Sequence, residues 1–252
     1  MNERQHGQRP EWQPDRLFAG ADAPASDFVF DQRVARVFAD MLDRSVPCYR
    51  ELIRLIGLLA ARHVGPAARV LDLGCSLGAA SASILARLPD PDLRILAVDN
   101  APAMIDELRR RLSDAVACGR VETRCADVSE VAVADVDIVL LNLTLQFLPR
   151  TRRLALLQRI HAGLAPDGVL ILVEKVDWPD VAVSDLMNGL HLDFKRAHGY
   201  SELEISRKRA ALEQVLLPDS IEVHEERLSD AGFTCCERWF QCLNFVGWLA
   251  WP

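Results

Sequence analysis

The stretch Arg69-Val-Leu-Asp-Leu-Gly-Cys-Ser-Leu-Gly78 decides the fold of this 252-residue chain. It begins as a short apolar strand, 69–73, and continues into a turn that carries two glycines before a predicted helix begins at Ala79. Glycines between a strand and a helix allow the backbone to approach a ligand closely. On its own, the pattern is also typical of a tight turn without a ligand.

Downstream of this turn, apolar strands alternate with helices that have one apolar face. This alternation is typical of an α/β protein with a doubly wound, mostly parallel sheet. The predicted strands are 69–73, 93–98, 121–125, 137–141 and 169–173, and the predicted helices are 79–88, 102–117 and 151–164, with a turn at 166–168. Two further strands, 235–240 and 243–251, are predicted to pair at the end of the sheet, which brings the number of strands to seven.

The regions outside this alternation set the domain boundaries. Residues 1–27 are polar and rich in Gln, Arg, Asp and Pro, so we predict a flexible N-terminal tail followed by a single domain, 28–252. Apolar residues at helical spacing predict two N-terminal helices before the first strand. The segment at about 178–217 is helical and more charged, and Ser201-x-x-Glu204 is a capping box. We therefore expect a helical insertion before the C-terminal hairpin.

Composition argues against several classes of protein. The formal net charge is −7, whereas proteins that bind polyanions usually carry a basic face, so we expect no direct nucleic-acid binding. The absence of a long apolar run and of a signal-peptide core predicts a cytoplasmic protein without membrane contact. Seven cysteines without a Cys-x-x-Cys pair, and the spacing of His191, Asp193 and His198, fit no zinc site. We therefore expect no metal.

Polar residues follow the carboxyl ends of the next three strands, where ligands bind in sheets of this kind. Asp99 and Asn100 end the second strand, and a carboxylate there can accept hydrogen bonds from the hydroxyls of a ribose. Asp99 also stands where a helix N-cap is expected, and the two roles can coexist. Asp127 follows the third strand and Asn142 follows the fourth. Four strand ends with polar residues in register indicate a nucleoside site.

The glycine turn distinguishes two kinds of nucleoside ligand. A dinucleotide fingerprint is Gly-x-Gly-x-x-Gly, but Ser76 and Ala79 stand in place of its second and third glycines. No pyrophosphate is implied, so we favour S-adenosylmethionine. In this interpretation Asp127 takes the adenine amino group and Asn142 meets the methionine end.

Longer strings make the interpretation more specific. They are the glycine turn, Arg44-Ser-Val-Pro47, Asn142-x-Thr-Leu-Gln-Phe147, Asp193-Phe-Lys-Arg196, Gly199-Tyr-Ser-Glu-Leu-Glu-Ile-Ser206 and Trp239-Phe-Gln-Cys242. Over about residues 28–249 they resemble the carboxy-S-adenosyl-L-methionine synthases, a family of the class I S-adenosylmethionine-dependent methyltransferase superfamily. The resemblance implies the strand order of that superfamily, in which a parallel sheet ends in an antiparallel hairpin.

The resemblance also implies an activity and a set of contacts. The family converts S-adenosyl-L-methionine and prephenate into carboxy-S-adenosyl-L-methionine, phenylpyruvate and water, and a tRNA carboxymethyltransferase then uses the product on wobble uridine. The family's nucleoside contacts fall on Tyr49, Gly74, Cys75, Ser76, Asp99, Asn100, Asp127, Val128 and Asn142. The new carboxylate is held by an arginine that falls on Arg209, reached from a partner subunit, which implies a homodimer. No residue is assigned as a general acid or base.

The residues alone leave alternatives open. Arg207-Lys-Arg209 is also typical of a solvated helix face, and Lys208 borders the same apolar stripe as Arg209. A guanidinium is nevertheless well suited to bidentate binding of a carboxylate. The competing functions are an ordinary methyltransferase that acts on a small molecule or on RNA, although the acidic charge argues against RNA, and a nucleoside-binding regulator without catalysis.

Overall fold

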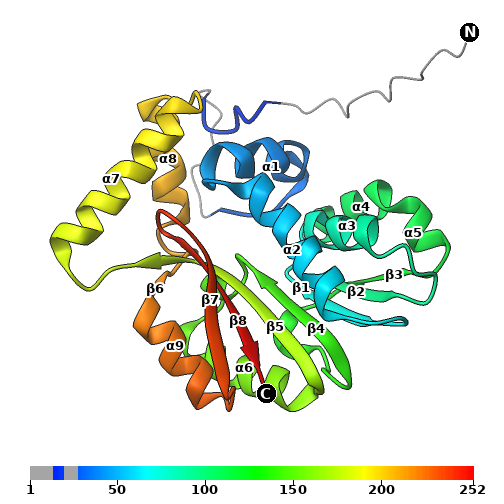
Figure 1. Cartoon of the computed structure of the whole chain (residues 1–252). Helices are drawn as coiled ribbons and strands as arrows, with labels where there is room; N and C mark the ends of the chain where they lie inside the picture. The colour runs from blue at the N-terminus through cyan, green and yellow to red at the C-terminus, as the bar shows by residue number, and fades with distance from the viewer. Residues whose placement is uncertain (1–13, 20–27) are drawn as a thin grey trace, which may run out of the picture.

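A twisted sheet with helices on both faces forms the centre of the computed structural model, which describes residues 14–19 and 28–252 (Figure 1). The strand order is β3-β2-β1-β4-β5-β8-β7, and a two-residue strand, β6, pairs with β5 beside this path. The strands are β1 (Arg69–Leu73), β2 (Arg94–Asp99), β3 (Val121–Cys125), β4 (Val136–Asn142), β5 (Leu164–Asp177), β6 (Asp219–Ser220), β7 (Cys235–Cys242) and β8 (Phe245–Trp251). Strands β1 to β5 are parallel, whereas β8 pairs antiparallel with β5 and β7. The predicted class and mostly parallel sheet are confirmed.

Helices cover the two faces of the sheet with separate apolar clusters. One face packs against α6 and α9, through residues such as Leu157 and Leu228, and the other packs against α2, α3 and α4, through residues such as Ile56 and Ile105. The helices are α1 (Gln32–Ser45), α2 (Tyr49–His63), α3 (Ala79–Arg87), α4 (Pro102–Arg111), α5 (Ser113–Ala117), α6 (Arg150–Gly163), α7 (Val181–Ala197), α8 (Glu202–Leu212) and α9 (Ile221–Asp230). Because both faces are covered, the ligand site has to lie at a strand end.

The glycine turn after β1 is fixed by its contacts with the neighbouring strands. Gly74 has a φ of +77°, which favours glycine, and a Cβ added there would lie 2.2 Å from the Thr144 side-chain oxygen. The N–H groups of Gly74 and Cys75 both donate to the carbonyl oxygen of Val98, at 2.8 and 2.9 Å. The turn is therefore anchored to β2 on one side and to the loop after β4 on the other.

Two local predictions differ from the structure. The predicted helix 102–117 is divided into α4 and α5, because the backbone leaves helical geometry at Leu112. The predicted turn at 166–168 lies inside β5, where the pairing with β4 jumps from Leu164 to Val169. The residues between these two pairs form a bulge, so the turn chemistry is accommodated without ending the strand.

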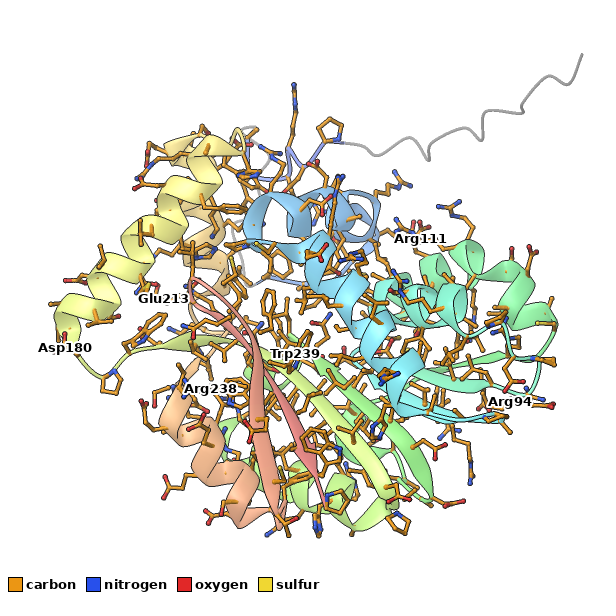
Figure 2. The ribbon with its side chains drawn as sticks, in the orientation of Figure 1. Arg94, Arg111, Asp180, Glu213, Arg238 and Trp239 are labelled. Carbon is orange, nitrogen blue, oxygen red and sulfur yellow. The ribbon has the colours of Figure 1, made fainter. Side chains whose placement is uncertain are left out.

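The predicted helical insertion is an arm made of α7 and α8, which we call the arm from here on (Figure 1). Helix α7 begins at the outer end of the arm, where its N-cap Asp180 lies, and runs from there toward α8 (Figure 2). The predicted capping box opens α8, since the Ser201 hydroxyl accepts from the Glu204 N–H and the Glu204 carboxylate accepts from the Ser201 N–H. The capping prediction is confirmed.

Six residues of the predicted tail, 14–19, pack against the domain instead of extending from it. Phe18 is buried in an apolar cluster with Phe28, and Asp15 is buried where its carboxylate accepts a hydrogen bond from the Tyr200 hydroxyl. Arg44 also donates to the backbone oxygen of Asp15, at 2.9 Å. The rest of the predicted tail, 1–13 and 20–27, lies outside the described residues. Within the described ranges, no helix is long and apolar enough to span a membrane.

Candidate functional site

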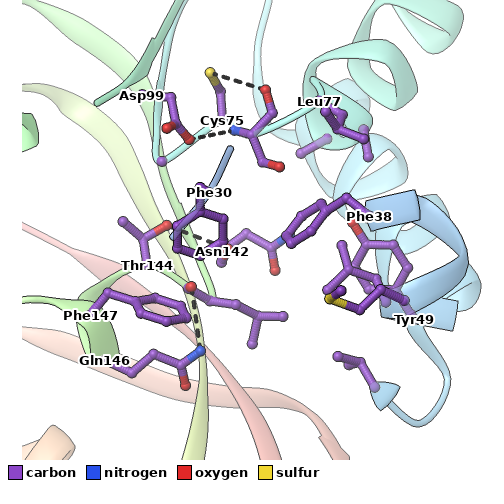
Figure 3. A pocket seen from close by; sticks show the side chains of 18 of the residues that line it. Phe30, Phe38, Tyr49, Cys75, Leu77, Asp99, Asn142, Thr144, Gln146 and Phe147 are labelled. Atoms are coloured by element: carbon purple, nitrogen blue, oxygen red, sulfur yellow. Dashed lines mark hydrogen bonds between the residues drawn. The ribbon is translucent and has the colours of Figure 1, made fainter. Parts of the chain in front are cut away.

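A cavity of about 640 Å³ lies at the carboxyl ends of β1, β2 and β4, with α1 and α2 on its other side (Figure 3). Its volume is within the range of small-molecule sites, roughly 300–1,000 Å³. The nine residues predicted to contact the nucleoside all line it: Tyr49, Gly74, Cys75, Ser76, Asp99, Asn100, Asp127, Val128 and Asn142. The fold therefore brings these nine residues to one place, and their contacts with a ligand stay predictions.

Asp99 is held in position by backbone groups. One carboxylate oxygen accepts from the Ser76 N–H of the glycine turn and the other accepts from the Ala101 N–H, each at 2.9 Å. Burial raises the pKa of Asp99, whereas these two hydrogen bonds act in the opposite direction. The N-cap of α4 is Ala101, so Asp99 caps the preceding turn rather than the helix itself. Each oxygen can still accept a further hydrogen bond from a ligand.

Asn142 presents an unsatisfied acceptor to the cavity. Its side-chain oxygen is buried and has no hydrogen-bond partner among the described residues. The loop that follows is folded around Glu174 of β5, whose carboxylate accepts from the N–H groups of Thr144, Leu145 and Gln146 at 2.7 to 3.1 Å. A buried amide oxygen without a donor suits a ligand that carries one, such as the ammonium group of an amino acid.

Among the described residues, only one of the two carboxylate oxygens of Asp127 accepts hydrogen bonds. Its Oδ1 accepts from the Ser129 N–H at 2.8 Å and from the Ser129 hydroxyl at 2.7 Å, and these bonds lower the pKa of Asp127. Its Oδ2 lies 4.0 Å from a guanidinium nitrogen of Arg152, a solvent-exposed pair. The carboxylate is therefore ionised, and Oδ2 is the oxygen that can meet an adenine amino group. Val128, the next residue, contributes an apolar surface to the cavity wall.

Several lining residues were not predicted from the sequence. Asp72 lies in β1 with its carboxylate accepting from the Ser81 hydroxyl at 2.6 Å, and burial raises its pKa to about 6. Phe30 packs edge-on against both Phe38 and Phe147, and the three rings form an aromatic wall of the cavity. A carboxylate inside an apolar strand was the available signal for Asp72. The string that ends at Phe147 was the signal for one ring of the wall.

Arg209 does not line the cavity of its own chain, and its side chain is exposed. The preceding residue, Lys208, is 6% exposed and does line the cavity. The prediction that Arg209 reaches a site from a partner subunit is compatible with this exposure and stays a prediction. The structure instead places a different cation of the same helix at the cavity wall.

The histidines of the arm have protein partners. His191 is buried and its Nε2 lies 2.7 Å from the backbone oxygen of Ser45, and His198 bonds to the backbone oxygen of Phe194 at 2.8 Å. Asp193 forms an ion pair with Arg196. In the part of the chain that the structure describes, no group of three metal-ligating side chains is assembled.

Known proteins match the chain over nearly its whole length. Residues 70–168 match the family model of a methyltransferase domain. A carboxy-S-adenosyl-L-methionine synthase of Trichlorobacter lovleyi is 50% identical over 237 residues, which cover 94% of this chain and 97% of the relative. Proteins of the same name from Klebsiella pneumoniae and Escherichia coli are 48% identical over 236 residues, which cover 94% of this chain and 96% of each relative.

Solved structures share the fold at low identity. Human N-acetylserotonin methyltransferase in complex with SAM has a TM-score of 0.58 at 15% identity, over 87% of this chain and 55% of that one. The pyocyanin biosynthetic protein PhzM has a TM-score of 0.60 at 17% identity, over 91% of this chain and 62% of that one. These likenesses show the fold, which is that of the class I methyltransferases. With relatives about half identical over almost all of its length, the chain belongs to the carboxy-S-adenosyl-L-methionine synthases, enzymes of the transferase type.

Proposed function

We propose that this protein converts S-adenosyl-L-methionine and prephenate into carboxy-S-adenosyl-L-methionine, phenylpyruvate and water. The observation that carries the proposal is the cavity itself, since the nine positions predicted to contact the nucleoside line it in a chain half identical to synthases of this name. The product would supply the carboxymethyl group that a second enzyme, a tRNA carboxymethyltransferase, places on wobble uridine. The cytoplasmic location and the absence of direct nucleic-acid binding stay predictions.

Each part of the nucleoside has a matching group in the cavity. Asp99 receives the ribose hydroxyls, because its carboxylate is fixed beside the glycine turn. The Oδ2 atom of Asp127 accepts from the adenine amino group, and the unsatisfied Asn142 oxygen accepts from the ammonium of the methionine part. Tyr49 begins α2 at the opposite wall and closes the site over the ligand.

The proposed reaction balances without a protein nucleophile. Prephenate loses carbon dioxide and expels hydroxide as its ring becomes aromatic. The sulfonium methyl group gives up a proton, which forms water with the hydroxide, and the resulting ylide carbon bonds to carbon dioxide. The protein contributes proximity and the exclusion of water. The aromatic wall of Phe30, Phe38 and Phe147 suits this role, because it keeps water away from a small uncharged intermediate.

We propose a homodimer as the active unit. Arg209 lies outside the cavity of its own chain, so it would hold the new carboxylate by reaching the site of a second copy. The arm that carries Arg209 also exposes apolar side chains on α7, including Leu186 at 61% and Leu190 at 41%. Apolar side chains exposed along one helix favour a protein contact there.

The test is a mass-spectrometric assay of purified protein with S-adenosyl-L-methionine and prephenate. We expect phenylpyruvate and S-adenosyl-L-methionine enlarged by one carboxyl group, and neither product when prephenate is omitted. S-adenosylhomocysteine with a methylated acceptor would instead identify an ordinary methyltransferase. Tight binding of S-adenosyl-L-methionine without either conversion would identify a regulator.

A further inference from the structure

The chain contains three lysines among its 29 Lys and Arg residues. They come from three different elements, with Lys175 in β5, Lys195 in α7 and Lys208 in α8. In the folded protein they gather around one place. The His191 Nε2 lies 2.7 Å from the Ser45 backbone oxygen, the Lys208 Nζ donates to the Ser45 hydroxyl, and all three lysines are within electrostatic reach of His191. A chain that otherwise uses arginine therefore gathers all of its lysines in one place. We call these three residues the lysine cluster.

The lysine cluster meets the cavity on the side of the arm through Lys208, while Lys175 and Lys195 are not among the residues that line it. Lys208 lines the cavity, and its Nζ donates to the Ser45 hydroxyl at 3.0 Å, another lining residue. Lys175 pairs with Phe245 in the ladder between β5 and β8, and its N–H donates to the Gln146 side-chain oxygen at 3.0 Å. Phe245 and Gln146 both line the cavity. A ligand beside the sulfonium site would therefore meet Lys208 first, with the strand that carries Lys175 directly behind the lining residues.

Positive charge exceeds negative charge in the lysine cluster. Lys208 has Asp15 at 3.7 Å, and Lys175 has Asp177 as an opposing charge, but the charges that act on Lys195 within the described residues are all positive. Burial lowers the pKa of Lys195 to about 7 and that of Lys208 to about 8. An ammonium group without an opposing charge, such as that of the half-buried Lys195, is unfavourable where the dielectric constant is low. The arrangement therefore favours the entry of an anion.

We propose that the lysine cluster is the subsite of the anionic cosubstrate and holds the carboxylate that this cosubstrate keeps through the reaction. The inference rests on the proposed function. Prephenate carries two carboxylates, of which one leaves as carbon dioxide and the other remains in phenylpyruvate. Ion pairing to the departing carboxylate would stabilise the substrate more than the transition state, which would slow the reaction. The lysine cluster therefore suits the retained carboxylate.

Lysine matches this task better than arginine does. An ammonium is a compact point charge that changes its pKa readily when buried, whereas a guanidinium is a broad fork that always stays charged. An ammonium group also occupies less space beside a carboxylate than a guanidinium group does. This explains why lysine occurs at these positions in a chain rich in arginine.

The direct test uses phenylpyruvate as a probe, because it contains the retained carboxylate and lacks the departing one. Calorimetric titration into the full-length protein saturated with S-adenosyl-L-methionine should show binding. Lys195→Met should weaken it about tenfold or more, as expected for the loss of a hydrogen bond to a charged group, and should leave the affinity for S-adenosyl-L-methionine within about twofold. The matched control is Arg196→Met, the adjacent exposed cation, which pairs with Asp193 and Glu202 and should not change either affinity.

Binding should also take up protons. Lys195 and Lys208 are charged below pH 7, and they lose charge as the pH rises through about 7 to 8, so affinity for phenylpyruvate should fall over this range. Arg209 and Lys175 act on Lys195 as further positive charges, whereas burial lowers the pKa of His191 to about 3, which leaves that residue neutral. Titrations at pH 7.5 in two buffers of different ionisation enthalpy should reveal uptake in the wild type.

Charges of both signs surround Lys208. Asp15 and Asp40 favour its charged form, Arg44 opposes it, and Tyr200 lies 3.4 Å from its Nζ. Lys208→Met, with folding checked by circular dichroism, is the second variant. It should weaken the binding of phenylpyruvate, as Lys195→Met should, and both variants should reduce the proton uptake.

Two results separate this inference from the proposed function. If phenylpyruvate fails to bind the wild type, or binds both lysine variants with unchanged affinity and proton uptake, the lysine cluster is not the subsite, even where prephenate is converted. If prephenate gives no carboxylated product but phenylpyruvate binding depends on the lysines, the subsite stands and the proposed reaction is wrong.

Discussion

The two sides of the cavity are built in different ways. On the side of the strand ends, backbone groups hold the side chains, as the two N–H donors to Asp99 and the three to Glu174 show. On the side of the arm, α8 presents the long cationic side chain of Lys208 to the cavity, while the neighbouring Arg209 is exposed outside it. The first side suits a ligand part common to many enzymes, and the second suits the part that distinguishes this reaction. In the proposed function, generic recognition is thus built on the sheet and specific recognition on the insertion.

The sharpest test of this contrast replaces one glycine of the glycine turn and one glycine of the arm by alanine. Gly74→Ala should destabilise the protein by roughly 2–5 kcal/mol, because the φ of +77° disfavours alanine and the new Cβ would overlap Thr144. Gly189→Ala in α7 has nothing within 4 Å of the new Cβ and should stabilise by about 0.5–1 kcal/mol. Urea unfolding of both variants measures the difference. A destabilised Gly189→Ala variant would mean that this face of α7 is covered in solution.

Removal of Arg209 should lower the affinity for one of the two ligands and leave the affinity for the other nearly unchanged. Arg209→Ala should weaken carboxy-S-adenosyl-L-methionine by about 2–4 kcal/mol, in the range for breaking a buried charge pair, and should hardly affect S-adenosyl-L-methionine. Arg209→Lys should recover part of the loss, since a point charge replaces a fork incompletely. Titration of both ligands into each variant gives the answer. Equal losses would make Arg209 structural, and no loss would return it to a solvated helix face.

Asp99 is the corresponding residue on the strand-end side, where a substitution should lower the affinity for both ligands equally. Asp99→Ala removes a charge-assisted contact with the ribose and should reduce the affinity for each ligand by about 1.5–3 kcal/mol. Asp99→Asn is the matched control for shape, because it retains an acceptor without the charge. Calorimetry that finds unchanged affinity in the Ala variant would place the ribose elsewhere.

The smallest effect is expected from the capping box of α8. Ser201→Ala removes the side-chain acceptor for the Glu204 N–H and should lower stability by about 0.5–2 kcal/mol. The loss should be felt mainly in the arm, so that binding of S-adenosyl-L-methionine changes less than binding of the carboxylated product. A uniform loss for both ligands would show that the arm and the strand ends respond as one unit.

The sequence predicted the strand-end side well for a physical reason. Buried parallel strands are nearly continuous apolar runs, so their ends are visible, and polar residues such as Asp99 and Asn142 stand out directly after them. The arm was harder to predict. Successive helical residues point about 100° apart, and the sequence pattern did not show whether Lys208 or Arg209 faces the cavity. The packed residues Asp15 and Phe18 were hidden by the polar composition around them.

Glu174 gives the loop after β4 an unusual dynamic character. Backbone amides in an irregular loop commonly exchange their hydrogens with solvent by small local openings. Here the N–H groups of Thr144, Leu145 and Gln146 are bound by a carboxylate that belongs to a central strand and is fully buried. They can exchange only when Glu174 releases them, so their protection factors should approach those of β5 itself. The loop that follows Asn142 is irregular in shape, but it should open only together with the sheet.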